Sequence, residues 1–290
     1  MIAFALFRCC PTAIFLKQYE SSTNAVLRKL GVEFSDINEF NCCGYPLKNI
    51  DFKAYVLAAA RNLSLAEKND VNILTFCNCC FNSLKQAQHL LKEDAALRED
   101  INKTLEKEGL VYKQVVEVKH LFEVLFKNIG LEKIEEKVVK TFNGLKIATH
   151  YGCHLLHPSQ IIQFDNPVTP SVFDQLVEVT GATSIFWTSK LNCCGSPLLG
   201  MDDDLSMDLT QTKINNARQS GADYLCTACV YCQLQFDQVQ KMMISRRNAK
   251  HQLASILYTQ LLGLSLGIDE EQLGINLNEL DISRIVNFLS

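Results

Sequence analysis

The stretch Asn41-Cys42-Cys43-Gly44-Tyr45-Pro46-Leu47 recurs almost unchanged as Asn192-Cys193-Cys194-Gly195-Ser196-Pro197-Leu198, and only the fifth residue differs. Each copy has a cysteine upstream and a Cys-x-x-Cys pair downstream. The upstream cysteines are Cys9 and Cys153, and the downstream pairs are Cys77/Cys80 and Cys229/Cys232. The chain therefore contains one five-cysteine arrangement twice.

The segments around the cysteines also repeat, as alternating strands and helices. Hydrophobic runs predict strands at residues 2–7, 32–37 and 71–76 in the first half, and at 146–151, 183–187 and 222–227 in the second. Helical periodicity predicts helices at 21–30, 51–68, 172–180 and 205–219. Further helical segments are expected at 85–108 and 120–129, and from residue 248 onward, where the tail would pack the two halves together.

This order of elements predicts an α/β fold with two pseudo-symmetric repeat domains. Each domain is expected to hold a mostly parallel sheet flanked by helices, with the cysteine loops at the carboxyl ends of the strands, where sites form in such sheets. A run rich in lysine and glutamate at 132–146 places the boundary, giving domains at 1–143 and 144–290. We expect the two cysteine sites to face one another across one crevice.

Composition restricts the partners and the compartment. A net charge of -4 argues against a nucleic-acid-binding protein, since a phosphate-binding face normally makes a domain basic. The most apolar stretch, residues 252–268, is interrupted by Thr259 and Gln260, so no transmembrane segment is expected. The N-terminus lacks the basic region of a signal peptide, which predicts a cytoplasmic protein. Thirteen cysteines in that reducing compartment indicate metal or redox chemistry instead of disulfides.

Three of the thirteen cysteines have no counterpart in the other half: Cys10, Cys79 and Cys226. Shifting the second half back by 152 residues aligns Cys226 with Leu74, inside a predicted strand. A cysteine in such a place packs as a small hydrophobic side chain. The spacing of Cys226, Cys229 and Cys232 matches part of a bacterial ferredoxin motif, but the position of the fourth cysteine in that motif is Phe236 here. We therefore expect these three to pack, and the ten repeating cysteines to be ligands.

The ligand chemistry leaves two metals open. A single tetrahedral zinc needs four ligands and usually takes them from two separated Cys-x-x-Cys pairs. Two adjacent cysteines direct their side chains apart, so they more readily bind different atoms of a multi-iron cluster. The residues favour iron-sulfur chemistry over zinc.

The doubled pattern of one cysteine, Cys-Cys-Gly and Cys-x-x-Cys resembles the CCG-domain proteins, most closely the B subunit of heterodisulfide reductase. The resemblance covers essentially the whole chain, including the tail at 258–267. It implies that each five-cysteine set holds a non-cubane four-iron four-sulfur cluster, the first through Cys9, Cys42, Cys43, Cys77 and Cys80, and the second through Cys153, Cys193, Cys194, Cys229 and Cys232.

The same resemblance implies an activity and partners. The activity is reductive cleavage of a disulfide lying between the two clusters, that of coenzyme M and coenzyme B or a related one. The chain has neither a dinucleotide-binding fingerprint nor a Walker A sequence. The implied partners are therefore the electron-supplying, ferredoxin-like iron-sulfur C subunit of such a reductase and its flavin-bearing A subunit. His154 is the candidate catalytic proton donor, with His157 as a weaker one.

Cations near the cysteine loops would meet an anionic substrate: Arg8, Lys48 and Lys190. Two other functions remain open. The chain is an electron-transfer component of another oxidoreductase complex, of the succinate, glycolate or glycerol-phosphate type, or it is a zinc scaffold without enzymatic activity. Iron and sulfide content separates the zinc scaffold from the other two.

Overall fold

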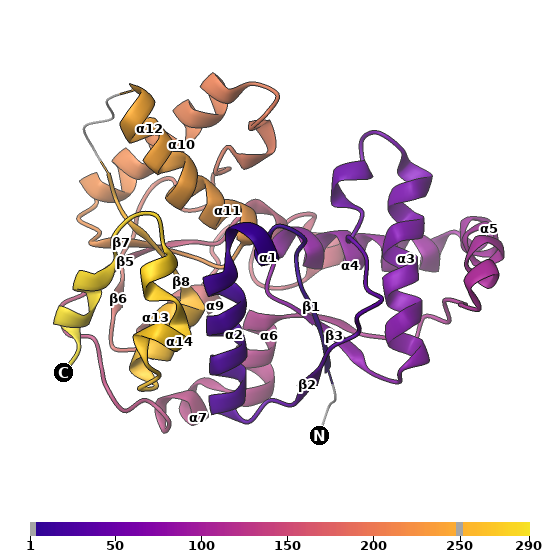
Figure 1. Ribbon diagram of the computed structural model, residues 1–290, viewed down its shortest axis with the longest axis horizontal. Helices are drawn as coiled ribbons and strands as arrows, with labels where there is room; N and C mark the ends of the chain where they lie inside the picture. The colour runs from indigo at the N-terminus through magenta and orange to yellow at the C-terminus, as the bar shows by residue number, and fades with distance from the viewer. Residues whose placement is uncertain (1–3, 248–251) are drawn as a thin grey trace. The chain divides into compact units, whose positions relative to one another are not determined.

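A computed structural model describes residues 4–247 and 252–290, which form two compact units (Figure 1). Unit 1 comprises residues 4–10, 33–124 and 154–167. Unit 2 comprises 11–32, 125–153 and the described part of 168–290. The units do not follow the sequence halves, because residues 11–32 belong to unit 2. The boundary at residues 143 and 144 stays a prediction about the repeats.

Unit 1 is built on a four-stranded parallel sheet of order β2-β1-β3-β4. Its strands are β1 Phe4–Phe7, β2 Phe34–Ser35, β3 Asn72–Thr75 and β4 Val118–His120. Its helices are α3 Phe52–Lys68, α4 Asn78–Glu93, α5 Ala95–Leu105, α6 Leu121–Glu123 and α8 Ser159–Ile162. Every residue of β1 is buried, as in a parallel strand covered on both faces, and α4 packs against β3, β4 and α3.

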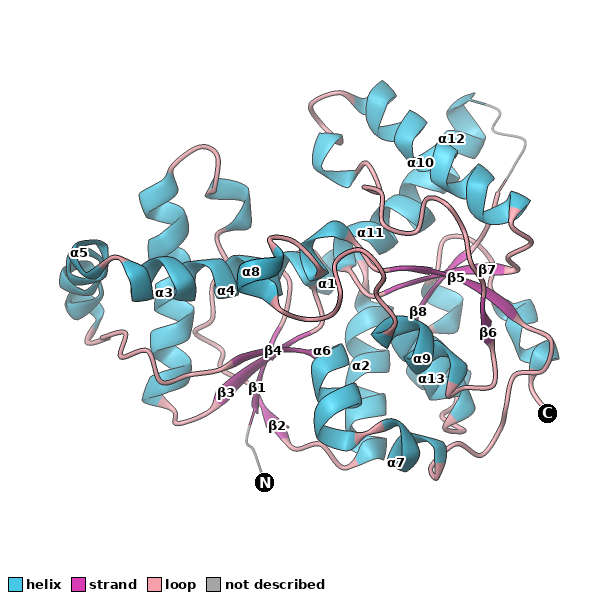
Figure 2. Cartoon of the chain, turned by 180° about the vertical axis from the view of Figure 1, so that it is seen from behind, coloured by secondary structure: helices cyan, strands magenta, loops and turns pink. Residues whose placement is uncertain are grey.

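Unit 2 repeats that topology with a parallel sheet of order β6-β5-β7-β8 (Figure 2). Its strands are β5 Lys146–His150, β6 Thr183–Ser184, β7 Tyr224–Thr227 and β8 Ser255–Leu257. Its helices are α1 Thr12–Phe15, α2 Lys17–Leu30, α7 Leu131–Glu135, α9 Val172–Glu178, α10 Asp203–Gln219, α11 Val230–Leu234, α12 Gln240–Arg247, α13 Tyr258–Ser265 and α14 Glu270–Leu273. Two π-helices span Val124–Ile129 and Gln235–Val239. The α/β class and the doubled parallel sheet are confirmed.

Helix α2 lies in unit 2 although its residues fall between β1 and β2 in the sequence. It packs against α13 and α14, and Ser22 Oγ lies 2.7 Å from Thr259 Oγ1 in a buried contact. Gly31, with φ +78°, ends α2 in the left-handed conformation that favours glycine. The tail thus packs on a helix from the first half of the sequence.

Several predicted elements differ from those observed. The fourth strands, β4 and β8, were not predicted: β8 falls in the tail expected as helix, and β4 falls between two expected helices and overlaps the second only at His120. Three-residue strands carry too little periodicity to be recognised. The helix expected at 85–108 is two helices, α4 and α5, since Asp94 caps the second through Leu97 N. The strands expected at 32–37 and 183–187 are two residues long. Residues 2, 3 and 248–251 lie outside the described part of the chain.

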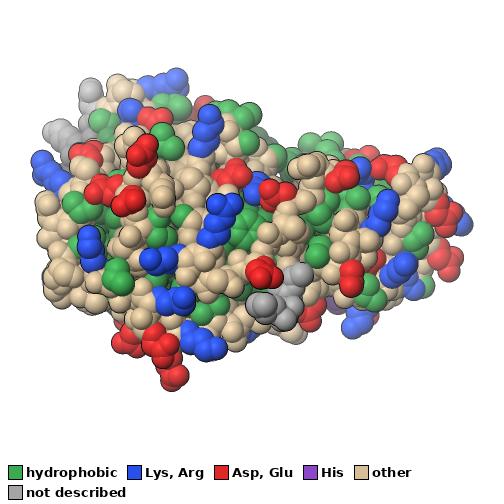
Figure 3. Space-filling model, turned by 60° about the horizontal axis from the view of Figure 1, so that its bottom comes forward, with side chains coloured by type: hydrophobic (Ala, Val, Ile, Leu, Met, Phe, Trp, Pro, Cys, Tyr) green, Lys and Arg blue, Asp and Glu red, His purple; other side chains and the backbone are tan. Residues whose placement is uncertain are grey.

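Charged side chains are of both signs on the face drawn in Figure 3. Lysine and arginine side chains are scattered there among aspartate and glutamate, with uncharged and hydrophobic atoms between them. Several of the chain's charged residues form exposed ion pairs, such as Lys53 with Asp100 and Lys241 with Glu279. Exposed pairs of this kind contribute little to stability. The balance of signs agrees with the small net charge of the sequence.

Two candidate cysteine metal centres

The first centre lies in unit 1, where two neighbouring strands deliver cysteines at their carboxyl ends. Cys9 follows β1, and Cys77 follows β3 as the N-cap of α4, which places Cys80 in the first turn of that helix. Phe7 and Thr75, the last residues of β1 and β3, are paired in the sheet. The Sγ atoms of Cys9, Cys77 and Cys80 consequently lie within 4.8 Å of one another.

The Cys-Cys-Gly loop brings two more thiols to this centre. The buried Cys43 side chain is hydrogen-bonded to Cys80, and the exposed Cys42 side chain to Cys43. The Cys80 side chain is also hydrogen-bonded to Cys77 and Cys9. The structure therefore connects all five cysteines that the repeat predicts for the first half.

The second centre repeats most of this arrangement in unit 2, but its upstream Cys153 is bonded to the Cys-Cys-Gly loop, whereas Cys9 is bonded to the Cys-x-x-Cys pair. Cys193 is hydrogen-bonded to Cys153 and Cys194, Cys194 to Cys232, and Cys232 to Cys229. As in the first loop, the first of the adjacent cysteines is exposed and the second is buried. The adjacent side chains thus point in different directions in both centres, one toward the interior and one toward solvent.

The glycine that follows each cysteine pair is required by geometry. Gly44 has φ +83° and Gly195 has φ +95°, which is the left-handed region. A Cβ atom at Gly44 would lie 2.7 Å from the carbonyl oxygen of Tyr55, and one at Gly195 would lie 2.5 Å from that of Ser206. This turn directs the N–H of Gly195 to Cys193 Sγ, at 3.4 Å. The glycine therefore lets the loop approach the following helix and supplies a donor to sulfur.

Hydrogen bonds divide the thiols of each centre into two kinds. The pKa of Cys193 is lowered, mainly by hydrogen bonds from Cys153 and Cys194, and the pKa of Cys42 is lowered in the same way by Cys10 and Cys43. The pKa of Cys194 is raised to about 12, because it donates to Cys193 and because it is buried. In both centres the exposed cysteine of the adjacent pair therefore has a lower pKa than its buried neighbour.

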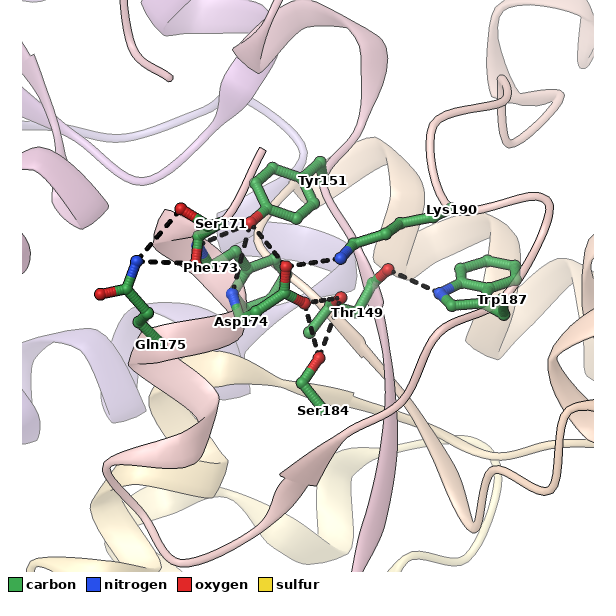
Figure 4. A network of polar contacts seen from close by, with 9 residues as sticks. All are labelled: Thr149, Tyr151, Ser171, Phe173, Asp174, Gln175, Ser184, Trp187 and Lys190. Atoms are coloured by element: carbon green, nitrogen blue, oxygen red, sulfur yellow. Dashed lines mark hydrogen bonds and ion pairs between the residues drawn. The ribbon is translucent and has the colours of Figure 1, made fainter. Parts of the chain in front are cut away.

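A polar network around Asp174 fixes the loops of the second centre (Figure 4). The Asp174 carboxylate, in the first turn of α9, accepts hydrogen bonds from Thr149 Oγ1 at 2.7 Å, Ser184 Oγ at 2.5 Å and Tyr151 O–H at 3.1 Å. It also pairs with Lys190 Nζ at 2.5 Å. Tyr151 lies two residues before Cys153, and Lys190 three before Cys193. One carboxylate therefore ties both cysteine-bearing segments to α9.

The three cysteines without a counterpart have different environments. Cys226 is completely buried in β7, paired with Thr149 of β5, and burial raises its pKa. Cys10 is exposed, and its Sγ lies 3.9 Å from Cys42 Sγ. Cys79 is buried, and its Sγ lies 3.3 Å from His154 Nδ1. Packing accounts for Cys226, whereas the other two contact residues of the predicted sites.

The candidate donors and cations named from sequence lie at the predicted loops. The His154 ring, besides contacting Cys79, meets Tyr45 edge-on at 5.0 Å, and His157 is exposed. Arg8 pairs with Asp36 at 2.7 Å, and Lys190 is neutralised by Asp174. Burial lowers the pKa of Lys48, which donates to Gln86 at 2.8 Å. All three cations therefore already have polar partners within the chain.

Two buried residues of the second centre were not identified from sequence. His150, the last residue of β5, has Nε2 at 3.2 Å from Cys232 Sγ, and its potential ligand atom lies within 4.8 Å of Cys194 and Cys232. Lys213, on α10, donates to the carbonyl of Asn192 at 2.9 Å. A comparison of the halves could have found both, since neither residue type stands at the equivalent place in the first half.

The donor atoms fit an iron-sulfur cluster. In each unit the five converging side chains all carry sulfur, the soft ligand that such clusters require. Four of the five are buried in the first centre and three in the second, where Cys153 is half-buried. A tetrahedral zinc would leave a fifth thiol unused.

Together, the doubled parallel sheet and its paired thiol centres define a class of two-repeat, cysteine-rich metal-binding α/β proteins. The family model described as "CCG: Cysteine-rich domain" matches residues 4–85 and 147–237, one match in each repeat. The chain belongs to the CCG cysteine-rich domain family.

Curated relatives cover nearly all of the chain. It is 35% identical over 96% of its length, and 94% of the relative's, to the B subunit of the ferredoxin/F(420)H(2)-dependent CoB-CoM heterodisulfide reductase of Methanosarcina acetivorans. It is 32% identical, over 97% of its length and 98% of the relative's, to the 8-methylmenaquinol:fumarate reductase membrane anchor subunit of Wolinella succinogenes. These relatives are subunits of oxidoreductases.

One solved structure shares the fold. A hypothetical protein from Helicobacter pylori superimposes with a TM-score of 0.76 and 17% identity, covering 97% of this chain. This chain spans 52% of the length of that one. In the part of the chain that the structure describes, no helix is both long and apolar enough to cross a membrane.

Proposed function

We propose that the chain is the catalytic subunit of a heterodisulfide reductase and binds one non-cubane four-iron four-sulfur cluster in each unit. The ligands would be the ten repeating cysteines. The observation that carries the proposal is the convergence of five thiols in each unit, where the cysteines of the Cys-Cys-Gly loop and of the Cys-x-x-Cys pair are connected in the same way in both. The similarity to a heterodisulfide reductase protein over 96% of the chain supports it.

The reaction would consume one disulfide, two electrons and two protons and release two thiols. Bound clusters would supply electrons one at a time and iron atoms that capture sulfur. The chain would hold the loops in place through Asp174 and through the glycines Gly44 and Gly195. His154, whose imidazole contacts both Cys79 and Tyr45, is the proposed proton donor to the leaving thiolate.

The substrate and partners follow from the same proposal. The substrate would be the disulfide of coenzyme M and coenzyme B or a related one, as the name of the Methanosarcina relative states for that protein. Electrons would come from two partner proteins, one ferredoxin-like with iron-sulfur clusters and one that carries a flavin. We place the protein in the cytoplasm, a reducing compartment in which the thiols of both centres would stay available as ligands.

A second function has specific support. One relative is the membrane anchor subunit of a fumarate reductase, and another, 25% identical over 80% of this chain, is a lactate utilization protein A from Macrococcus caseolyticus. In this alternative the same two clusters pass electrons within an oxidoreductase complex, without binding a disulfide.

The decisive experiment measures metal and then turnover. Anaerobically purified protein should contain about eight iron and eight sulfide per chain, as two four-iron clusters require. Reduced methyl viologen should then drive release of two thiols per disulfide of coenzyme M and coenzyme B. Full iron with no thiol release would favour the electron-transfer function. Zinc without sulfide would overturn both and indicate a scaffold.

Matched cysteine variants test which thiols bind the clusters. Cys194→Ser should halve the iron content and abolish thiol release, because it removes a buried ligand of the second centre. Cys226→Ala is the control, since it removes an equally buried thiol in the same unit that lies inside β7. Loss of iron in the control to the same extent would contradict the ligand assignment.

A further inference from the structure

The two cysteine centres differ at a buried position that the repeat makes directly comparable. Helices α3 and α10 are both 17 residues long, and each begins at an aspartate cap, Asp51 or Asp202. Counting from these caps, Asn62 of α3 is equivalent to Lys213 of α10. Both side chains are buried, at 0% and 2% exposure. A neutral amide in one centre is therefore replaced by a cation in the other.

Both residues hold the Cys-Cys-Gly loop through its backbone. Asn62 Nδ2 donates to the carbonyl oxygens of Asn41 and Cys42, each at 3.2 Å. Lys213 Nζ donates to the carbonyl of Asn192 at 2.9 Å and to that of Ser189. Because an amide is sufficient for this task in the first centre, the positive charge of Lys213 is not needed to hold the loop.

A buried ammonium group is costly unless negative charge lies beside it. Burial lowers the pKa of Lys213 to about 8, and the nearby thiols oppose this, Cys194 most strongly and then Cys232. The Nζ atom also lies 4.7 Å from the centre of the Trp187 ring, a favourable cation-π distance. The surroundings of Lys213 thus suit a cation that faces a negatively charged sulfur site.

A second difference has the same sign. His150 ends β5 opposite Thr227, and Phe7 ends β1 opposite Thr75, so the two are equivalent in the sheets. His150 Nε2 lies 3.2 Å from Cys232 Sγ, whereas Phe7 packs on Phe40 with ring centroids 5.1 Å apart. The second centre therefore has a polar imidazole beside a ligand sulfur where the first has a phenyl ring.

We propose that Lys213, supported by His150, makes the centre in unit 2 the more easily reduced of the two, so that an electron arriving from a donor resides there first. The inference rests on the proposed function, since it requires clusters at both centres. Reduction adds one negative charge, which a nearby buried cation stabilises, as does a hydrogen bond that His150 donates to sulfur in the tautomer with its proton on Nε2. Lys213 and His150 are positioning residues here, acting through the ligand cysteines.

The test measures the midpoint potential of each centre separately. Cys43→Ser leaves the cluster of unit 2, and Cys194→Ser leaves that of unit 1. Each variant is loaded anaerobically, assayed for iron and sulfide, and titrated with redox mediators while electron paramagnetic resonance is recorded. We expect the unit 2 centre to be at least tenfold more reduced than the unit 1 centre at the same potential, which corresponds to about 59 mV for one electron.

Substitutions then assign the difference to the charge. In the Cys43→Ser background, Lys213→Gln should lower the midpoint potential of the remaining centre and Lys213→Arg should preserve it. The matched control is Arg218→Gln in the same Cys43→Ser background, which removes an exposed cation from the same helix and should leave that centre's potential unchanged. If the Lys213→Gln protein does not bind its cluster, a second variant tests the same point. Asn62→Lys in the Cys194→Ser background adds the charge to unit 1 and should raise the midpoint potential of that centre.

The outcomes separate the inference from the proposed function. Absence of iron and sulfide from the wild-type chain overturns both. Two loaded clusters with equal potentials, or with the unit 1 centre more easily reduced, overturn only the inference. The same holds if Lys213→Gln loads fully and keeps the wild-type potential, or if Asn62→Lys leaves the potential of unit 1 unchanged.

Discussion

Gly195 joins two requirements at a single residue, because its backbone is left-handed and its missing side chain leaves room for α10. The N–H that this conformation turns inward donates to Cys193 Sγ, while Thr210 Oγ1 donates to the carbonyl of Cys194 at 3.0 Å. In the first repeat, Ser83 Oγ donates to the carbonyl of Cys43 at 2.8 Å. Single small residues therefore decide where the thiols of each centre point.

Substituting Gly195 separates backbone strain from steric clash. Gly200 is the matched control, since it also has a positive φ, +86°, but a Cβ atom at this position would have no neighbour within 4 Å. Gly200→Ala should cost about 1–2 kcal/mol of unfolding free energy, because alanine is strained in the left-handed region. Gly195→Ala should cost about 1–3 kcal/mol more, because its Cβ meets the Ser206 carbonyl. Equal losses in urea unfolding of the two variants would show that the contact with α10 is unimportant.

Among the helices and strands, buried polar side chains join segments that hydrophobic packing alone would leave unspecified. Asp237 lies in the π-helix Gln235–Val239, completely buried, and accepts the N–H groups of Glu279 at 3.0 Å and Leu280 at 2.8 Å. Burial raises the pKa of Asp237 to about 6, against these two hydrogen bonds. The C-terminal tail is thus held by a carboxylate that binds a proton more readily in the folded state than in the unfolded state.

This docking predicts a pH dependence of stability. Because the pKa of Asp237 is higher in the folded state, that state binds more protons between about pH 4 and pH 6, and stability falls as pH rises through this window. Lowering the pH from about 7 to about 4.5 should recover about 2 kcal/mol from this group. The Asp237→Asn variant should lack this increase when its unfolding free energy is measured by urea unfolding at both pH values.

The control for this experiment is Asp269→Asn, which changes an exposed carboxylate in the same unit. We expect its unfolding free energy to follow the wild-type pH dependence. A wild-type pH dependence that survives Asp237→Asn would show that other groups cause it.

Across the whole molecule, contacts between distant parts of the sequence define the units. Helix α2 packs in unit 2, against α13, although the sheet of its own repeat lies in unit 1. The buried hydroxyls of Ser22 and Thr259 meet at this contact, and Ser22 Oγ also donates to the Gln18 carbonyl at 2.6 Å. Thr259 is therefore the donor to Ser22.

This contact predicts coupling between residues that are 237 positions apart. Ser22→Ala should destabilise the chain by about 1–3 kcal/mol, because it leaves the buried Thr259 hydroxyl without an acceptor. Adding Thr259→Val removes that hydroxyl, so the double variant should lose about 1 kcal/mol less than the sum of the single ones. Additive losses in a double-mutant cycle of urea unfolding would contradict the coupling.

The repeat, the α/β class and the grouping of the ten cysteines can be predicted from the sequence, because each follows from the order of motifs and elements along the chain. Cys9 and Cys77 follow hydrophobic strands, and parallel strands bring their carboxyl ends to one edge. The glycine of each Cys-Cys-Gly loop also marks its turn in the sequence, as its positive φ shows.

The packing of α2 in unit 2, the short strands β4 and β8, and the environments of His150 and Lys213 emerge only in three dimensions. A three-residue strand has too few residues to show a period, and its existence depends on a neighbouring strand that shares its hydrogen bonds. Lysine on a predicted helix is ordinarily exposed, and only packing against Trp187 and the Cys193 loop shows that Lys213 is buried. Side-chain environments arise from contacts between segments far apart in the chain, and local sequence order does not contain those contacts.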